Sequence, residues 1–278
     1  MPGGGGVIAS NYLYNIAPRH GTTLAIITSS FANEQLLGNP QIKYDARNFL
    51  ALGRLLDTTS VLFFWHTSPI KTLADMLSRP ATVAISSVNE APAYRLNAMN
   101  RYLGTRLKPI AGYPAARDYV LAAERGETDG GTSTWIGLSQ LFAPQLRDGR
   151  LRIPVQFALA RDANMAEVPT VLELAEDCPG CRSAPSGLRE EAVSVFRVLV
   201  ANDEIGRSVF TTPNVPPARL SALRTAFAAM LADGEFRSEA ERLSLPLATK
   251  SGEEMQKIVA DLFTTSLQVM AKVRELSK

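Results

Sequence analysis

Between residues 82 and 135, short apolar segments alternate with segments of helical composition, and this alternation limits the possible folds more than any other feature. Residues 82–85, 107–111 and 128–135 predict strands. The helix after the first strand takes Pro92 in its first turn and ends at Gly104, and the next lies between Pro114 and Gly126. Strands that alternate with helices of about 10–15 residues indicate a parallel sheet.

The rest of the chain adds further strands and a helix-rich end. Short apolar or β-branched runs predict strands at residues 22–28, 60–65, 151–159 and 208–212. Helices are expected near residues 34–37, 73–77, 187–202, 216–232, 234–243 and 251–275. The sequence therefore predicts an α/β protein in which helices dominate after Pro169.

Glycines at positions 3 to 6 lead directly into a helical segment at residues 7–17, with no strand before them. In an α/β fold such a turn normally receives the chain from a strand, because glycine permits the tight reversal that starts the helix. We therefore expect that the chain begins partway into its fold.

The bulk composition excludes several classes of function. At 278 residues the chain can form one large domain or two modest ones, and 46% hydrophobic with 20% charged residues is ordinary for a folded protein. A net charge of +2 without a run of basic residues argues against nucleic-acid binding. The most apolar run, residues 61–65, is only strand-sized, and glycines rather than a basic and then apolar leader follow Met1.

Residues that could carry catalysis or bind a metal are few. Cys178 and Cys181 form a C-x-x-C pair, which fits a local loop staple or free thiols, a redox pair, or half of a zinc site. A zinc site needs two further ligands, and the only histidines, His20 and His66, stand alone in their segments. No G-x-S-x-G, H-E-x-x-H or Walker motif occurs, and Asp129, a candidate general base, has no catalytic partner nearby in the sequence. We therefore expect no enzyme activity, no cofactor and no metal.

Several segments, spread in order over nearly the whole chain, resemble the substrate-binding proteins of tripartite tricarboxylate transporters, the Bug family. The resembling segments are Pro2-Gly3-Gly4-Gly5-Gly6 with the helix after it, Trp65-His66-Thr67-Ser68-Pro69, Gly112-Tyr113-Pro114, Glu124-Arg125-Gly126-Glu127-Thr128-Asp129-Gly130, Glu167-Val168-Pro169-Thr170-Val171 and Thr211-Thr212-Pro213-Asn214-Val215-Pro216. Against the family pattern, we expect the chain to lack the signal peptide and the first strand.

The resemblance implies a two-lobed α/β fold of the periplasmic binding protein type II, or Venus-flytrap, kind, here truncated at its N-terminus. Lobe one would comprise residues 1–68 and 204–278, and lobe two residues 69–203. A monomer in the periplasm would capture a small organic anion, a carboxylate, between the lobes and deliver it to a membrane permease. Two alternatives stay open: a ligand-sensing accessory protein that uses the same cleft, and an enzyme on a similar scaffold with Asp129 or the cysteine pair as its chemistry.

The ligand is expected at the junctions where strands lead into helices, because free amides and the helix dipole there favour an anion. Four junctions carry small polar side chains, although serine, threonine and asparagine are also ordinary helix caps and turn formers. The resemblance nominates Ser29, Ser30, Ser86, Ser87, Asn89 and Tyr113, and the fourth junction adds Thr132 and Ser133. Relatives usually have more glycine at the positions of residues 86–89, so the ligand is expected to differ from the usual ones.

Overall fold

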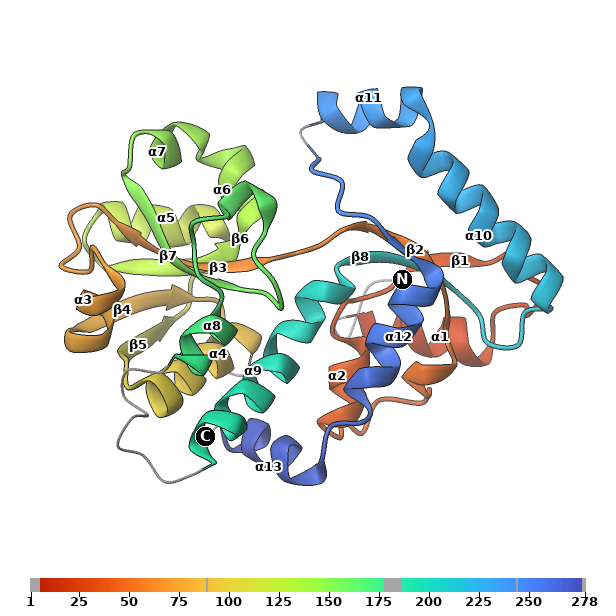
Figure 1. Ribbon diagram of the computed structural model, residues 1–278, viewed down its shortest axis with the longest axis horizontal. Helices are drawn as coiled ribbons and strands as arrows, with labels where there is room; N and C mark the ends of the chain where they lie inside the picture. Colours follow the sequence, from red (N-terminus) through yellow and green to blue (C-terminus); the bar gives the residue numbers. More distant parts are fainter. Residues whose placement is uncertain (1–5, 89, 178–186, 244, 277–278) are drawn as a thin grey trace. The chain divides into compact units, whose positions relative to one another are not determined.

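The computed structural model describes residues 6–88, 90–177, 187–243 and 245–276 (Figure 1). Its contacts divide the chain into two compact units. Unit 1 comprises Met1–Thr58 and Ala201–Thr265, and unit 2 comprises Thr59–Val200 and Ser266–Lys278. Helix α9 (Leu188–Ile205) crosses from unit 2 into unit 1. Both units combine a sheet with helices, which confirms the predicted α/β class.

Unit 1 is built on an antiparallel sheet of strand order β1-β8-β2-β9. Its elements are α1 (Val7–Asn15), β1 (Leu24–Ile26), α2 (Phe31–Leu36), β2 (Leu50–Leu56), β8 (Arg207–Thr211), α10 (Pro217–Ala232), α11 (Gly234–Arg242), β9 (Lys250–Ser251) and α12 (Gly252–Leu262). The core of the unit is aromatic: the rings of Phe31, Tyr44, Phe49 and Phe210 meet edge to face or tilted, with centroids 5.2 to 6.4 Å apart. Such pairs add to the stability that burial alone provides.

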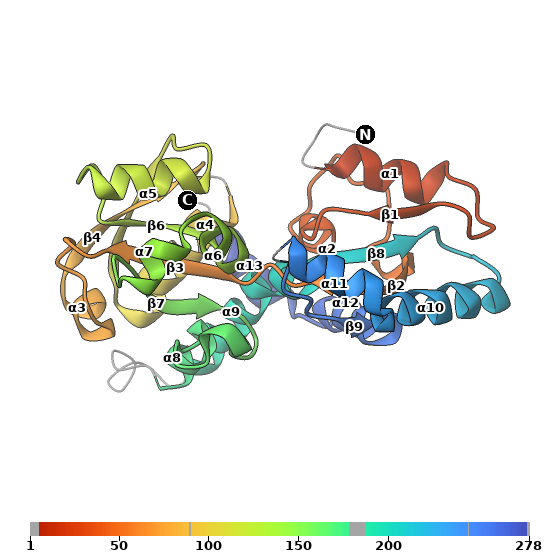
Figure 2. The same ribbon diagram turned by 90° about the horizontal axis from the view of Figure 1, so that it is seen from above.

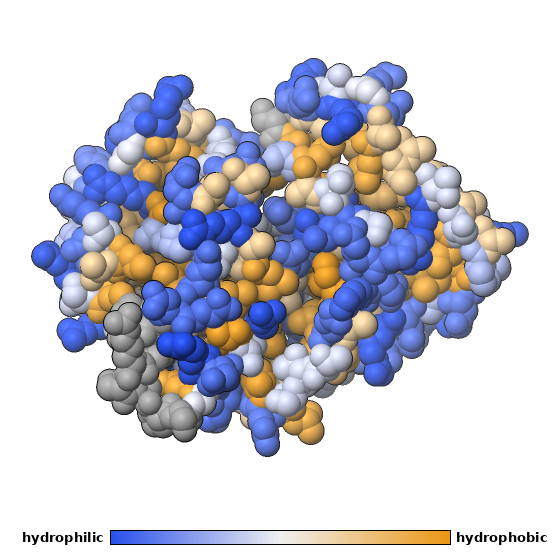
Figure 3. Space-filling model, in the orientation of Figure 1, coloured by the Kyte–Doolittle hydropathy of each residue, from blue (hydrophilic) through white to orange (hydrophobic). Residues whose placement is uncertain are grey.

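Helix α11 shows how the helices of unit 1 divide into a polar and an apolar side. Ala240 is buried and Phe236 is half-buried, whereas the charged residues of the helix are exposed. Figure 3 shows these hydrophilic side chains at the surface of α11. Asp233 caps the helix, since its carboxylate accepts a hydrogen bond from the Phe236 amide at 2.8 Å.

Unit 2 contains a five-stranded sheet of order β5-β4-β6-β3-β7. Its elements are β3 (Ser60–Trp65), α3 (Leu73–Ser78), β4 (Pro80–Ile85), α4 (Ala91–Ala98), β5 (Arg106–Ala111), α5 (Ala116–Glu124), β6 (Gly130–Thr134), α6 (Trp135–Leu141), α7 (Ala143–Arg147), β7 (Leu151–Phe157), α8 (Val171–Glu176) and α13 (Leu267–Glu275). Helix α5 packs against β3, β4 and β6, whereas α8 packs against β7 on the opposite side of the unit (Figures 1 and 2). The expected strand over residues 107–111 forms despite Pro109, because β5 is an edge strand that can lack one amide donor.

The expected parallel sheet is correct for only part of the molecule. β4 pairs in parallel with β5 and β6, but β3 pairs antiparallel with β6 and β7, and the sheet of unit 1 is antiparallel throughout. Local alternation of strands and helices does not determine which distant strand inserts between two others.

Two further details differ from expectation. Residues 251–275 form α12 and α13 rather than one helix, because Ser266 starts a new helix by accepting from the Val269 amide. Strand β2 was not expected, since Gly53 and Arg54 interrupt its apolar pattern and its pairing with β8 shifts register twice.

The lobes were expected to divide at residues 68/69 and 203/204. The contacts instead divide the chain at residues 58/59, 200/201 and 265/266. Strand β3 pairs within the sheet of unit 2, with Val61, Phe63 and Trp65 in the core of that unit. Helix α13 belongs to unit 2 as well, since Arg101 forms an ion pair with Glu275 at 3.0 Å.

The glycine pair at the start of β6 allows α5 to lie close to the sheet. A Cβ atom at Gly131 would lie 2.8 Å from the Cβ of Tyr119 and 2.9 Å from the Phe63 ring, and one at Gly130 would lie 1.9 Å from the Phe63 carbonyl oxygen. Both distances to Gly131 are shorter than ordinary carbon contacts. Only a glycine at position 131 therefore leaves room for the Tyr119 side chain to pack directly against β6.

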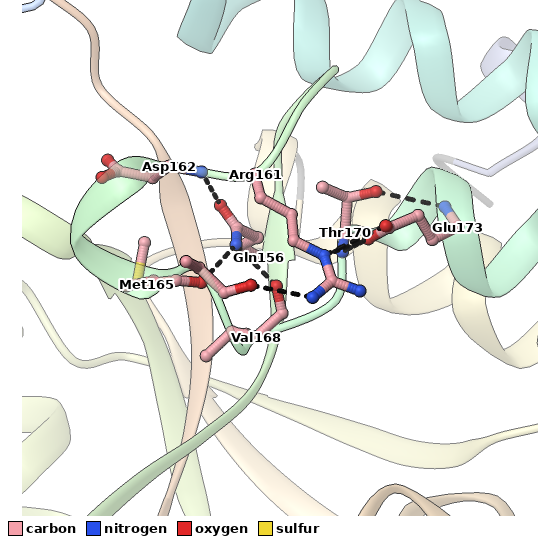
Figure 4. A network of polar contacts seen from close by, with 8 residues as sticks. Gln156, Arg161, Asp162, Met165, Val168, Thr170 and Glu173 are labelled. Atoms are coloured by element: carbon pink, nitrogen blue, oxygen red, sulfur yellow. Dashed lines mark hydrogen bonds and ion pairs between the residues drawn. The ribbon is translucent and has the colours of Figure 1, made fainter.

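The segment between β7 and α8 is fixed by the side chain of Gln156, which is fully buried (Figure 4). Its carboxamide nitrogen donates to the carbonyl oxygens of Met165 at 3.1 Å and Val168 at 2.7 Å, and its oxygen accepts from the Asp162 amide at 2.8 Å. The Gln156 amide also donates to Pro169 O at 3.0 Å. One residue thus binds the segment at four points, namely Asp162, Met165, Val168 and Pro169.

A second set of contacts in Figure 4 holds the start of α8. Arg161 Nε lies 3.0 Å from both carboxylate oxygens of Glu173, and Glu173 and Thr170 form a reciprocal capping box. The hydrogen bond from Arg161, together with the Thr170 amide, lowers the pKa of the Glu173 carboxyl. Glu173 therefore stays ionised and able to cap α8 in mildly acidic solution.

We expect Gln156→Glu to destabilise unit 2 by about 3 kcal/mol, because a carboxylate would face two carbonyl oxygens in a buried position. Urea unfolding followed by circular dichroism measures the change. Gln268→Glu, at an exposed position of α13, is the matched control and should leave the midpoint unchanged. Equal midpoints for the two variants would contradict the role given to Gln156.

We expect Gly131→Ala to cost about 1–3 kcal/mol, because the added methyl group must push Tyr119 or Phe63 out of place. Gly234→Ala, at the first residue of α11 where a methyl group meets nothing within 4 Å, should be neutral or slightly stabilising. Thermal unfolding and the near-ultraviolet signal of the aromatic residues check both. Tolerance of alanine at position 131 would show that the close approach is not required.

Candidate functional site

Two of the predicted ligand junctions are joined by the backbone of unit 2. The Gly112 amide donates to Ser86 O and the Tyr113 amide to Ile85 O, each at 3.3 Å. Because β4 pairs in parallel with both β5 and β6, the carboxyl ends of the three strands share one edge of the sheet. The structure thus brings the segments of Ser86, Ser87 and Tyr113 together, as expected for a site at the strand ends.

The Ser86 hydroxyl has protein partners of its own. It donates to the carboxylate of Glu90, which directly precedes α4, and it is hydrogen-bonded to the hydroxyl of Tyr119 from α5. Tyr119 is buried, and this burial raises the pKa of its hydroxyl, with the charges of Glu90 and Asp118 adding to the rise. Ser86 therefore lies at the centre of a small polar cluster.

The Tyr113 hydroxyl, like that of Ser86, is bound to a carboxylate of the protein. It donates to the Glu127 carboxylate at 3.3 Å. The pKa of the Tyr113 hydroxyl is raised by loss of solvent and then by the charge of Glu127. Glu127 also lies 3.9 Å from the guanidinium of Arg125.

The third junction in unit 2 is formed by a different residue from those predicted. Thr132 is buried within β6, paired with Leu62, and does not lie at the strand end. Ser133 is half-buried and pairs with Val61. Thr134 is the last strand residue, and its hydroxyl caps α6 by accepting from the Gly137 amide at 3.2 Å. Thr134 thus serves as an ordinary helix cap, which was the alternative to ligand binding for the polar residues at these junctions.

In unit 1, Ser29 and Ser30 lie between β1 and α2. Ser30 occupies the N-cap position of α2 without capping it, and its hydroxyl instead lies 3.0 Å from that of Thr28. The start of α1 approaches the same place, since a Cβ at Gly6 would lie 3.0 Å from Thr28 Cβ. The positive φ of Gly6 and this close approach both require glycine there. The first turn of α1 carries no acidic residue, so that its dipole is not offset locally.

The other candidate residues are accounted for as follows. Asn89, Cys178 and Cys181 lie outside the described residues. The Asp129 carboxylate accepts from the Thr82 amide and hydroxyl, each at 2.8 Å, so its position is that of a structural acceptor between β4 and β6. Among the described residues, no cluster of three histidine, cysteine or acidic side chains is able to hold a metal ion. Within that same part of the chain, none of the helices combines the length and apolar character of a membrane span.

Two residues that contact the Ser86 junction, Glu90 and Tyr119, were not among the expected ones. Glu90 had a local signal, because it stands four residues after Ser86 at the start of a helix. Tyr119 had none, since its approach to Ser86 depends on the packing of α5 over Gly131.

A separate cavity of about 360 Å³ lies elsewhere in unit 2. It is lined by residues of the opposite end of β3 and of the segment before α8, including Phe64, Arg152 and Val168. None of the predicted site residues contributes to it.

Comparison with known proteins gives matches in structure but not in sequence. No family model matches the chain, and no protein of curated function matches it. A TctC solute-binding protein from Polaromonas superposes with a TM-score of 0.70 at 17% identity, covering 99% of this chain and 84% of that one. An adipate-bound protein of R. palustris gives 0.61 at 19% identity, covering 98% and 83%.

A third match is the periplasmic binding protein BugD, with a TM-score of 0.60 at 15% identity and coverage of 99% and 84%. The identities are low, so these matches concern the fold. They agree with the fold that the sequence motifs imply. The chain therefore has the two-lobed α/β fold of the periplasmic binding proteins, in the form found in the TctC and Bug proteins that its motifs resemble.

Proposed function

We propose that this chain is an extracytoplasmic solute-binding protein that captures a small organic acid through its strand-to-helix junctions. The proposal rests on one edge of the sheet of unit 2. There the segments of Ser86 and Tyr113 are joined by backbone hydrogen bonds. Amides at strand ends and helix starts bind carboxylates without any catalytic group. Structures of similar fold are described with bound adipate and with bound malate, which supports this class of ligand.

The biological role that goes with this proposal is uptake. The captured acid would be passed to the membrane permease of a tripartite tricarboxylate-type transporter, and the protein would act in the periplasm without enzyme activity. Closure of the lobes would follow from the ligand binding the closed state better than the open one. The sensing role remains the alternative, and capture of a permease or of a sensor kinase by the tagged protein distinguishes the two.

We expect at least one compound from a panel of mono-, di- and tricarboxylates, amino acids and aromatic acids to raise the melting temperature of the purified protein. A ligand at 100 times its Kd adds about 2.7 kcal/mol of stability, which thermal unfolding resolves easily. Ser30→Ala should weaken the shift, because it removes one of the paired hydroxyls at the unit 1 junction.

Ser238→Ala is the matched control, because Ser238 is exposed on α11 and belongs to none of the predicted junctions. It should leave the ligand-induced shift unchanged. A cooperatively folding protein that no organic acid stabilises would refute the proposed function.

A further inference from the structure

The cavity of about 360 Å³ in unit 2 is lined by two cationic side chains, Arg152 and Lys71. It lies where β3 ends and β7 begins, whereas Ser86 and Tyr113 follow the ends of β4 and β5. Within residues 6–88, 90–177, 187–243 and 245–276, neither cationic side chain forms an ion pair. The one acidic residue of the lining, Glu167, is exposed, so the cavity carries a net positive charge.

The walls of this cavity are mainly apolar. Phe64, which pairs with Arg152 in the sheet, is buried, and so is Ile70. The other apolar lining residues are Leu73, Ile153, Pro154, Val168 and Pro169. A guanidinium group presents a planar fork of N–H donors that matches a carboxylate. Beside apolar walls, this arrangement fits an anion with an apolar body better than a small polyacid, which would leave the walls without a partner.

A second cavity, of about 270 Å³, adjoins the first, because Leu73 and Pro169 line both. Its other apolar lining residues are Leu77, Leu103 and Leu174. Glu173 and Asp177 complete the lining, and the Glu173 carboxylate is turned toward Arg161 (Figure 4). Every residue of both cavities belongs to unit 2. The first cavity is therefore cationic, and the second is apolar with acidic residues.

We propose that these adjoining cavities form a second binding site, which holds a medium-chain monocarboxylate. Its carboxylate meets Arg152 and Lys71 in the first cavity, and its alkyl chain passes Leu73 into the leucine-lined second cavity. The reverse orientation would place the carboxylate beside Glu173 and Asp177, which repel it. This site is separate from the strand-end junctions and does not depend on the proposed function.

A series of acids that differ only in chain length tests the site. Isothermal titration of the full chain compares hexanoate, octanoate and decanoate. We expect the affinity to rise about two- to fourfold per added methylene, the larger factor corresponding to about 0.8 kcal/mol for each one fully buried. Arg152→Gln should weaken all three acids by about tenfold and leave this increment unchanged, since it removes only the contact with the carboxylate. Lys71→Gln, at an exposed position, should weaken all three less strongly.

Two further variants separate the alkyl chain from the charge. Leu174→Ser should reduce the increment between octanoate and decanoate and leave hexanoate nearly unchanged, because it alters only the second cavity. Glu167→Gln should tighten all three acids by about twofold, because it removes a like charge from the first cavity. Arg207→Gln, on β8 of unit 1, and Leu121→Ser, on α5, are the matched controls, since both residues are exposed and line neither cavity. Neither should change any affinity.

Three results would overturn the proposal. One is a decanoate affinity that both Arg152→Gln and Lys71→Gln leave unchanged in cooperatively folding protein, which would place the acid elsewhere. Another is equal affinity for decyltrimethylammonium, which has the same chain and a cationic head. The third is co-sedimentation with phosphatidylglycerol vesicles, lost in Arg152→Gln, without any binding of decanoate, which would assign the cavities to a membrane lipid.

Discussion

The sheet of unit 2 depends on the side chain of Asp129. β4 and β6 pair over only two residues, Val83 with Gly130 and Ala84 with Gly131, which is a short contact for two parallel strands. Asp129 extends it, because its carboxylate accepts both the amide and the hydroxyl of Thr82. Its carbonyl oxygen also accepts from the Trp65 amide at 3.0 Å, which ties in the antiparallel strand β3. Asp129 thus reinforces the place where β6 joins the parallel strand β4 to the antiparallel strand β3, and the parallel pairing of β4 with β5 and β6 puts the strand ends of the candidate site on one edge.

Much of the local structure could be predicted from the sequence, because it is determined by neighbours in the chain. The strands at residues 82–85 and 107–111, and the helix that begins around Pro92, follow from apolar runs and from the placement of proline and glycine. The orientation of β3 and β7 could not be predicted in this way. Their partners lie between 66 residues (Phe64 to Gly130) and 97 residues (Ser60 to Phe157) away in the sequence, and nothing in the strands themselves favours one direction.

The candidate site shows the same division. The resemblance nominates Ser86 and Tyr113, which lie just after β4 and β5, and the parallel pairing of these strands brings their segments together. Thr132 lies within β6 rather than at its end, although a strand was expected over residues 128–135, so the strand end is at Thr134. The partners of the hydroxyls were not predictable either. Whether a serine such as Ser30 caps a helix or bonds a neighbouring side chain depends on rotamers that only packing determines.

The docking of the segment around Gln156 has a consequence for how the protein behaves before folding is complete. β7 is an edge strand, and its Gln156 backbone pairs with the segment at Pro169 and Thr170, which covers part of its free hydrogen-bonding side. The other edge, β5, carries Pro109, which has no amide to offer. An intermediate with the Gln156 segment undocked would expose a row of unpaired amides and carbonyls able to recruit a strand from another chain. The hydrogen bonds of Gln156 thus also keep part of an edge strand covered, in addition to fixing the segment before α8.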